Sequence, residues 1–201
     1  MLTVLKSLIT LNLKYKSIKL IKGRLKPCKD SVGGIQAIYF INYGSMGPIT
    51  YDVTDTDVID SIGTGVSCYK YDVHFASSLT QNIQSSTENG TVAFEQVLEI
   101  SMPKLSKEDN KEIKLIAYGH PHIVVEDQNG SFFLAGTVNG CEVTGGTIVT
   151  GTAMGDMSGY TLTLTGMERT PANFLASDLT AAGGTIVPGA FLIYRNKTKL
   201  F

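Results

Sequence analysis

Three small groups of His, Asp and Glu are the residues most able to do chemistry in this 201-residue chain. In the first group, His120 and His122 flank Pro121, and Cys141 and Asp127 follow downstream. Imidazole, thiolate and carboxylate groups of this kind bind zinc. Because the spacing matches no standard zinc motif, we expect a helix-to-strand turn with a His on each side of the proline, and no bound metal.

The second group is an acidic stretch that contains Asp52, Asp55, Asp57 and Asp60. Carboxylates this close together could hold calcium. The stretch lacks the alternating Asp-x-Asp-x-Asp-Gly spacing and the closing Glu of an EF-hand loop. We therefore expect a solvated acidic loop.

The third group is the pair Glu95 and Glu99, four residues apart. On a strand this spacing separates the two carboxylates by ~13 Å, whereas the paired acids of glycosidases lie ~5–9.5 Å apart. A hydrolase would need a closer acid from another strand, and nothing points to one. The chain also contains no GxSxG, GxxxxGK[ST], GxGxxG or HExxH motif. We expect no catalytic residue, no cofactor and no enzymatic activity.

The three cysteines are Cys28, Cys68 and Cys141, and no CxxC pair occurs. An odd number without paired spacing argues against a disulfide framework and fits a reducing compartment. We expect the three thiols to behave as small hydrophobic residues.

Charge is distributed unevenly along the chain. Residues 1–29 contain eight Lys or Arg and no acid, and the remainder has nine basic and eighteen acidic residues, a net charge of −9. Nucleic-acid binding depends on Lys and Arg that neutralise phosphates. The acidic body is therefore a poor candidate for gripping DNA and a better one for a surface past which DNA slides.

Residues 1–26 form a basic arm with three open interpretations: an arm that pairs with a neighbouring subunit, a basic amphipathic surface segment, or a stretch translated upstream of the natural start. We favour an arm that is poorly ordered or depends on a partner. Polar residues interrupt its apolar run well short of the ~20 residues that a membrane span needs. It also lacks the features of a signal peptide, so we expect no membrane partner.

The composition, with 21 Gly and no Trp, suits many short strands joined by tight turns. Hydrophobic patterns predict a β domain over 27–170 and a C-terminal extension over 171–201 that ends in a strand. Residues 167–182 are expected to form a linker or a short helical turn. The predicted strands are Ile35–Ile41, Ile49–Val53, Val66–Phe75, Ser78–Thr87, Thr91–Met102, His122–Asp127, Ser131–Val138, Gly140–Gly151, Gly159–Gly166 and Phe191–Tyr194.

The strongest local pattern is a long hairpin around Asn89-Gly90, a pair that supplies the positive φ angles of a tight reversal. Its returning strand alternates, so that one face lies on a core and the other in water. The predicted inner residues are Val92, Phe94, Leu98, Ile100 and Met102, and the predicted outer residues are Thr91, Glu95, Glu99 and Ser101.

One helix is predicted after this hairpin. Ser106 is a good N-cap, and Asp109 three residues later resembles a capping box. Gly119 ends the helix and Pro121 prevents it from resuming. The expected fold is mainly β, an antiparallel β-sandwich or barrel with one packed α-helix.

Three stretches of the sequence carry a family resemblance. They are Phe94–Ile100 with the helix that follows, the hairpin Val124–Gly130 leading to Leu134-Ala135-Gly136, and the run Gly155–Gly166. The opening Pro27–Ile35 also resembles the start of phage virion proteins of this general kind. Over residues 25–175 the chain resembles the tail tube proteins of tailed bacteriophages and their relatives in tail hubs and rings.

The resemblance implies a structural protein of the virion tail, assembled in the cytoplasm of a bacterial host. It implies a hexameric ring or tube with a channel for DNA, whose partners are further copies, other tail proteins and DNA in passage. No residue of the contact between copies can be named. The resemblance places the long hairpin at the channel wall, with five residues facing DNA: Gln81, Gln84, Glu88, Glu95 and Glu99.

An alternative is a β-sandwich module that binds a ligand or a carbohydrate. Such a module would present a concave patch of exposed aromatic residues. The absence of Trp and the scatter of the nine Tyr weigh against it.

Overall fold

A computed structural model of the chain describes residues 22–73 and 76–189. By contacts the chain divides into two compact units, Met1–Ser31 and Val32–Phe201. In the first unit, residues 22–31 are exposed and contain no helix or strand. The rest of the predicted basic arm, the predicted strand Phe191–Tyr194 and the end of the strand predicted to reach Phe75 lie outside the described residues.

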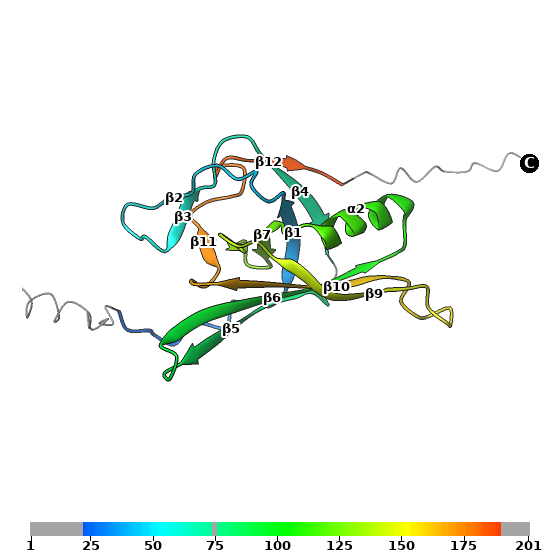
Figure 1. Ribbon diagram of the computed structural model, residues 1–201, viewed down its shortest axis with the longest axis horizontal. Helices are drawn as coiled ribbons and strands as arrows, with labels where there is room; N and C mark the ends of the chain where they lie inside the picture. The colour runs from blue at the N-terminus through cyan, green and yellow to red at the C-terminus, as the bar shows by residue number, and fades with distance from the viewer. Residues whose placement is uncertain (1–21, 74–75, 190–201) are drawn as a thin grey trace, which may run out of the picture. The chain divides into compact units, whose positions relative to one another are not determined.

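The second unit contains an eight-stranded sheet and a four-stranded sheet (Figure 1). The larger sheet has the strand order β12-β4-β1-β7-β8-β11-β3-β2. In chain order its strands are β1 (Ile35–Ile41), β2 (Thr50–Tyr51), β3 (Val58–Ser61), β4 (Val66–Asp72), β7 (His122–Asp127), β8 (Phe132–Ala135), β11 (Asn173–Leu175) and β12 (Gly184–Val187).

The smaller sheet has the strand order β5-β6-β10-β9. Its strands are β5 (Ser78–Ser86), β6 (Thr91–Pro103), β9 (Glu142–Val149) and β10 (Gly159–Glu168), and all its pairings are antiparallel. The helix α2 (Lys107–Tyr118) connects β6 to β7. The prediction of a mainly β fold with a packed helix and a long hairpin is therefore confirmed.

Several expectations need correction. Neither sheet closes into a barrel, and two pairings of the larger sheet are parallel, β11 with β3 and β12 with β4. The segment 167–182 is not a linker, because β11 lies within it and joins β8 to β3. The expected boundary at residue 170 thus separates strands of one fold, and β3 forms inside the stretch expected to be an acidic loop.

Two clusters of buried residues hold the second unit together. The first lies between the two sheets and the helix, where Ile38 of β1, Leu98 of β6, Ile113 of α2 and Leu162 of β10 share one core. The second lies on the other side of the larger sheet and includes Tyr39 and Leu179. The central strands β1 and β7 are buried on both faces, which explains their nearly continuous apolar sequences.

The helix begins and ends as predicted. The Ser106 hydroxyl accepts a hydrogen bond from the Asp109 N–H at 3.0 Å, and Glu108 and Asp109 lie in the first turn. At the other end, the Gly119 N–H donates to the Ile116 carbonyl. The Tyr160 hydroxyl donates to the Ser106 carbonyl at 3.0 Å, which fixes the start of α2 against β10.

Candidate functional site

The outward side of the four-stranded sheet is mainly polar, with Val97 and Met167 as apolar members, and is called here the polar face. It consists of the side chains that alternate with the buried residues of β5, β6 and β10. The register places Ser78 and Thr163 on either side of Glu99, and Asn82 and Met167 on either side of Glu95. On β10 the alternation is complete, since Thr161, Thr163 and Thr165 are half-exposed between buried neighbours.

The structure brings three of the five predicted wall residues together on the polar face: Gln84, Glu95 and Glu99. Glu88 lies in the exposed turn between β5 and β6, on neither strand. Gln81 is on the opposite side, because it pairs with the buried Gln96 and its Oε1 accepts a hydrogen bond from the Ala172 N–H at 2.8 Å. The expectation that Gln81 shares the outward face is wrong, since residues three apart on a strand point to opposite faces.

Neutral groups organise the polar face. Glu95 Oε2 accepts hydrogen bonds from the side-chain amides of Asn82 at 3.3 Å and Gln84 at 3.2 Å. Hydroxyl pairs join β9 to β10, with 2.6 Å between the Oγ1 atoms of Thr147 and Thr161. Amides therefore hold the Glu95 carboxylate in place, and the hydroxyl pairs hold β9 against β10.

The strands β5, β6, β9 and β10 contain no Lys or Arg, whereas they contain Glu95, Glu99, Glu142 and Glu168. A surface of this charge offers a phosphate no counter-charge. The expected absence of Lys thus extends to every strand of the sheet, whereas the acids lie on β6, β9 and β10.

Buried polar side chains attach this sheet to the turn that follows β8. Gln96, on the inner side of β6, accepts a hydrogen bond from the Gly136 N–H at 2.8 Å and donates one to the Thr170 carbonyl at 3.3 Å. Glu168 Oε1 accepts from the N–H groups of Val138 and Asn139, both at 2.8 Å. The sequence reasoning missed both residues, although each interrupts an apolar run on an inward-facing position.

The hairpin extends past the core. The last pair between β6 and β10 is Phe94 with Glu168, so the tip of the hairpin lacks that neighbour (Figure 1). Ile83, the partner of Phe94 on β5, is 70% exposed, and Val92, beyond this point, is 56% exposed, although both lie on the inward side of the strands. The hairpin thus carries an uncovered apolar tip.

The two edges of the four-stranded sheet are β5 and β9. Natural sheets often protect an edge strand with Lys or Pro, because unpaired N–H and C=O groups recruit other chains. Neither strand contains Lys or Pro. On β9, Ile148 is also 57% exposed. The β9 edge has a bulge opposite Thr163 and Leu164 and the charged Glu142, which are other ways to protect an edge. The β5 edge has no charged residue and no bulge, so it is the more open of the two to pairing.

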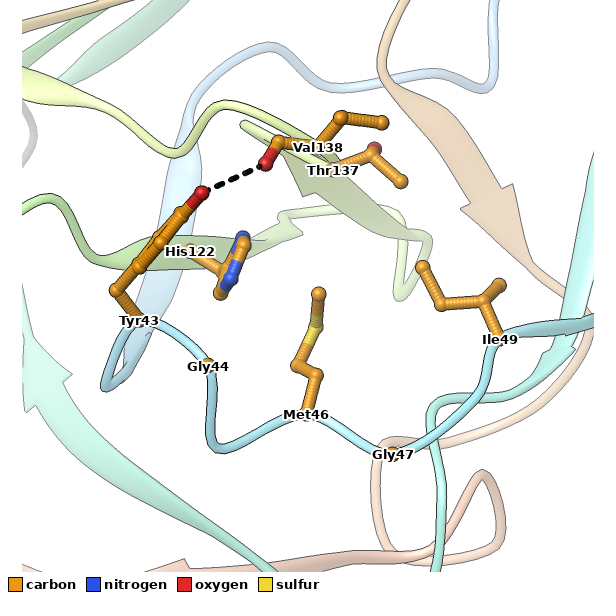
Figure 2. Close-up of a pocket in the computed structure, with 8 residues that line it drawn as sticks. All are labelled: Tyr43, Gly44, Met46, Gly47, Ile49, His122, Thr137 and Val138. Atoms are coloured by element: carbon orange, nitrogen blue, oxygen red, sulfur yellow. Dashed lines mark hydrogen bonds between the residues drawn. The ribbon is translucent and has the colours of Figure 1, made fainter.

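A separate cavity of about 380 Å³ lies beside the turn after β1. Figure 2 shows Tyr43 and His122 on one side of it, and Met46 and Ile49 on another. The Tyr43 and His122 rings stack at 5.2 Å, and His122 Nδ1 lies within hydrogen-bond distance of the Gly136 carbonyl. His122 is buried. The cavity therefore combines an apolar wall with a fixed imidazole.

The proposed zinc donors have different partners. His120 Nδ1 lies 3.2 Å from Glu142 Oε1, while His122 faces Gly136. Among the described residues, no three His, Cys, Asp or Glu side chains converge in a way that could hold a metal ion. Asp52 Oδ1 accepts hydrogen bonds from the N–H groups of Thr54 and Asp55, and these bonds lower the pKa of Asp52. The aspartate stretch thus stabilises its own turn.

The thiols lie in three different environments. Cys28 is exposed, Cys68 is in the second core, and Cys141 is in the first core. Burial raises the pKa of Cys68 to about 11. Burial, with a smaller contribution from Glu168, raises the pKa of Cys141 to about 12. These two thiols are protonated at neutral pH and therefore weak nucleophiles.

Within residues 22–73 and 76–189, no helix combines the length and the apolar character needed to cross a bilayer. Comparison with protein families, with curated proteins and with solved structures finds no match to this chain.

Proposed function

We propose that this protein is a structural subunit of a bacteriophage tail, which associates with further copies into a ring or tube. In this proposal the polar face lines a channel through which DNA passes. The protein acts without catalysis, in the virion tail, after assembly in the bacterial cytoplasm. Its partners are copies of itself and other tail proteins, and six copies per ring is the expected number.

The observation that carries the proposal is a four-stranded sheet without Lys or Arg whose two edge strands, β5 and β9, contain neither Lys nor Pro. A channel wall for DNA must not hold phosphates, and a cation-free face with Glu95 and Glu99 meets that requirement. The edge strands β5 and β9 allow one copy to pair with the next. Such head-to-tail contacts form a closed ring when the rotation between copies closes.

The uncovered hairpin tip gives additional support. Ile83 and Val92 are apolar, exposed and on the side of the sheet that elsewhere faces the core. Burial of these side chains by a neighbouring subunit would be favourable, at about 25 cal/mol per Å² of apolar surface. The tip therefore provides a contact that a monomer leaves unused.

Negative-stain electron microscopy and sedimentation velocity of the full chain test this proposal. We expect rings or tubes with a central opening, whose abundance increases with protein concentration. A protein that remains strictly monomeric at high concentration would exclude the ring.

The cavity beside Tyr43 and His122 favours a second candidate, a module that binds a small ligand. Aromatic and apolar side chains with one fixed polar group are typical of such sites. Calorimetric titration with mono- and disaccharides distinguishes the candidates. Saturable binding that Tyr43→Ala abolishes, in a protein that forms no rings, would favour the binding module.

A further inference from the structure

A groove of about 380 Å³ lies between α2 and the strands β1 and β4, apart from the polar face. Phe40, Tyr69 and Tyr71 line it from the strands, and Tyr43 lines it from the turn after β1. The Phe40 and Tyr71 rings meet edge to face at 5.1 Å. Across from them lie Glu112, Leu115 and Ile116 of α2. The groove thus has an aromatic floor and a helical wall.

The groove is both apolar and electronegative. Leu115 is 58% exposed and Tyr69 is 39% exposed, so its apolar lining is open to solvent. Its lining contains Glu112 and no Lys or Arg, and its one histidine, His120, lies 3.2 Å from Glu142 Oε1. Burial raises the pKa of Tyr71 to about 12, and the negative charges of Glu112 and Asp109 contribute to the increase. The negative charges of two carboxylates of α2 are therefore felt at the aromatic residue Tyr71, which lines the groove.

Aromatic rings beside a carboxylate are suited to a Lys or Arg side chain. A cation is attracted to the ring face, and its aliphatic stem packs on apolar surface. The carboxylate then supplies the counter-charge and a charge-assisted hydrogen bond. The expected occupant is a peptide segment in which a cationic side chain follows apolar residues.

The chain's own sequence contains such a segment. Residues 190–201 read Ala-Phe-Leu-Ile-Tyr-Arg-Asn-Lys-Thr-Lys-Leu-Phe, with three basic residues and no acid. Residues 30–189, in contrast, contain six basic and eighteen acidic residues, a net charge of −12. The acidic body is thus complementary in charge to this segment, and the isotope test below distinguishes a second copy from the same chain.

We propose that the groove between α2 and β4 binds residues 190–201 of a second copy, with a cationic side chain seated between Tyr71 and Glu112. This contact uses neither the polar face nor the edges β5 and β9. It links copies by a different surface from the one that lines the channel, and it goes beyond the proposed function.

Zero-length carbodiimide coupling, which joins a carboxylate to a lysine amine, tests the proposal on the full chain. Equal amounts of ¹⁴N- and ¹⁵N-labelled protein are mixed, coupled, digested and analysed by mass spectrometry. We expect mixed-isotope peptides that join Glu112 to Lys197 or Lys199. Cross-links at Glu112 that join only peptides of the same isotope, or an absence of these cross-links, would overturn the proposal.

Two matched variants on α2 distinguish an effect of the groove from an effect of overall negative charge. Glu112→Gln has no carboxylate to couple at that position, so the informative cross-linking variant is Glu108→Gln. Glu108 lies in the first turn and outside the groove lining, and its substitution should leave the cross-link at Glu112 intact. A fluorescent peptide with the sequence 190–201 should bind Glu112→Gln about tenfold more weakly than the unaltered chain. Equal binding to both would contradict the proposal. Electron microscopy measures ring formation separately from the cross-link. The proposed ring and the proposed groove contact can therefore fail independently.

Discussion

The side-chain oxygen of Gln96 accepts a hydrogen bond from the Gly136 N–H at 2.8 Å, and this contact joins the four-stranded sheet to the turn after β8. Gln96 is only 1% exposed, so water cannot replace the bond. Gly136 has a φ of +64°, and a Cβ there would lie 2.7 Å from the Gly140 backbone. The two residues together fix the position of the polar face relative to the larger sheet.

Gln96→Ala should destabilise the fold by roughly 1–3 kcal/mol, because it leaves the Gly136 N–H and the Thr170 carbonyl without their partner. Chemical denaturation measures the change. Gln84→Ala is the matched control, since Gln84 is an exposed residue of the same hairpin and should change stability by less than about 0.5 kcal/mol. Equal losses in the two variants would contradict the role given to Gln96.

Ile83→Ser combined with Val92→Ser should weaken self-association at least tenfold and leave the isolated subunit folded. Both side chains are already largely exposed, so their loss costs the monomer little. Sedimentation velocity and circular dichroism give the two measurements. Val53→Ser, at a fully exposed loop residue, serves as the control for loss of surface apolar area. Unchanged association in the double variant would exclude the hairpin tip from the contact.

Glu95→Lys with Glu99→Lys should make assembled particles retain DNA. Each new phosphate contact should add about −0.9 to the slope of log binding constant against log salt. Filter binding across a salt series measures this slope. Glu95→Gln with Glu99→Gln removes the acids without adding cations and should resemble the unaltered protein. An unchanged slope in the double Lys variant would argue against a channel wall on this face.

Stability should decline as pH rises above about 9. The pKa of Cys68 is raised to about 11 and those of Cys141 and Tyr71 to about 12, so the folded chain keeps protons that the unfolded chain releases. The stability contribution is complete below the ordinary pKa values and is lost as pH passes through the raised ones. Denaturant titrations between pH 8 and about 10.5 follow the loss.

Cys68→Ala should reduce this alkaline loss, even though it lowers stability at neutral pH. Cys28→Ala should not, because Cys28 is exposed. The slope of stability against pH is the quantity to compare. Identical slopes in Cys68→Ala and the unaltered chain would show that the Cys68 thiol does not cause the loss of stability at alkaline pH.

Local chemistry made much of the fold predictable from the sequence. The hairpin is recognisable because Asn89-Gly90 suits a tight turn, and Gly90 has a φ of +61°. The helix is recognisable from Ser106 and Gly119. These features depend on residues near one another in the chain, where propensity and capping act directly.

Long-range pairing was not predictable in the same way. Phe174 of β11 pairs with Val58 of β3, and Ile186 of β12 pairs with Cys68 of β4. Strands of three and four residues carry little periodic signal, and these two partners lie more than a hundred residues away. Tertiary packing decides such strands, so the pattern of 167–182 gave the wrong expectation.

In the candidate site too, the sequence predicted what local alternation determines and not what tertiary packing determines. Alternation correctly grouped Glu95 with Glu99, because both lie on one strand. Polarity alone misplaced Gln81, whose inward position is satisfied by the Ala172 N–H. The groove between α2 and β4 is assembled from three segments of the chain, so no local pattern marks it.

The absence of Lys and Arg from the four-stranded sheet also determines how the protein responds to reagents. Trypsin has no cleavage site between Lys70 and Lys104, or between Lys114 and Arg169, so all four strands lie within two long tryptic fragments. Amine-reactive dyes and acetylating agents likewise find no lysine on these strands. A preparation labelled to saturation on its amines would therefore keep the polar face chemically unmodified.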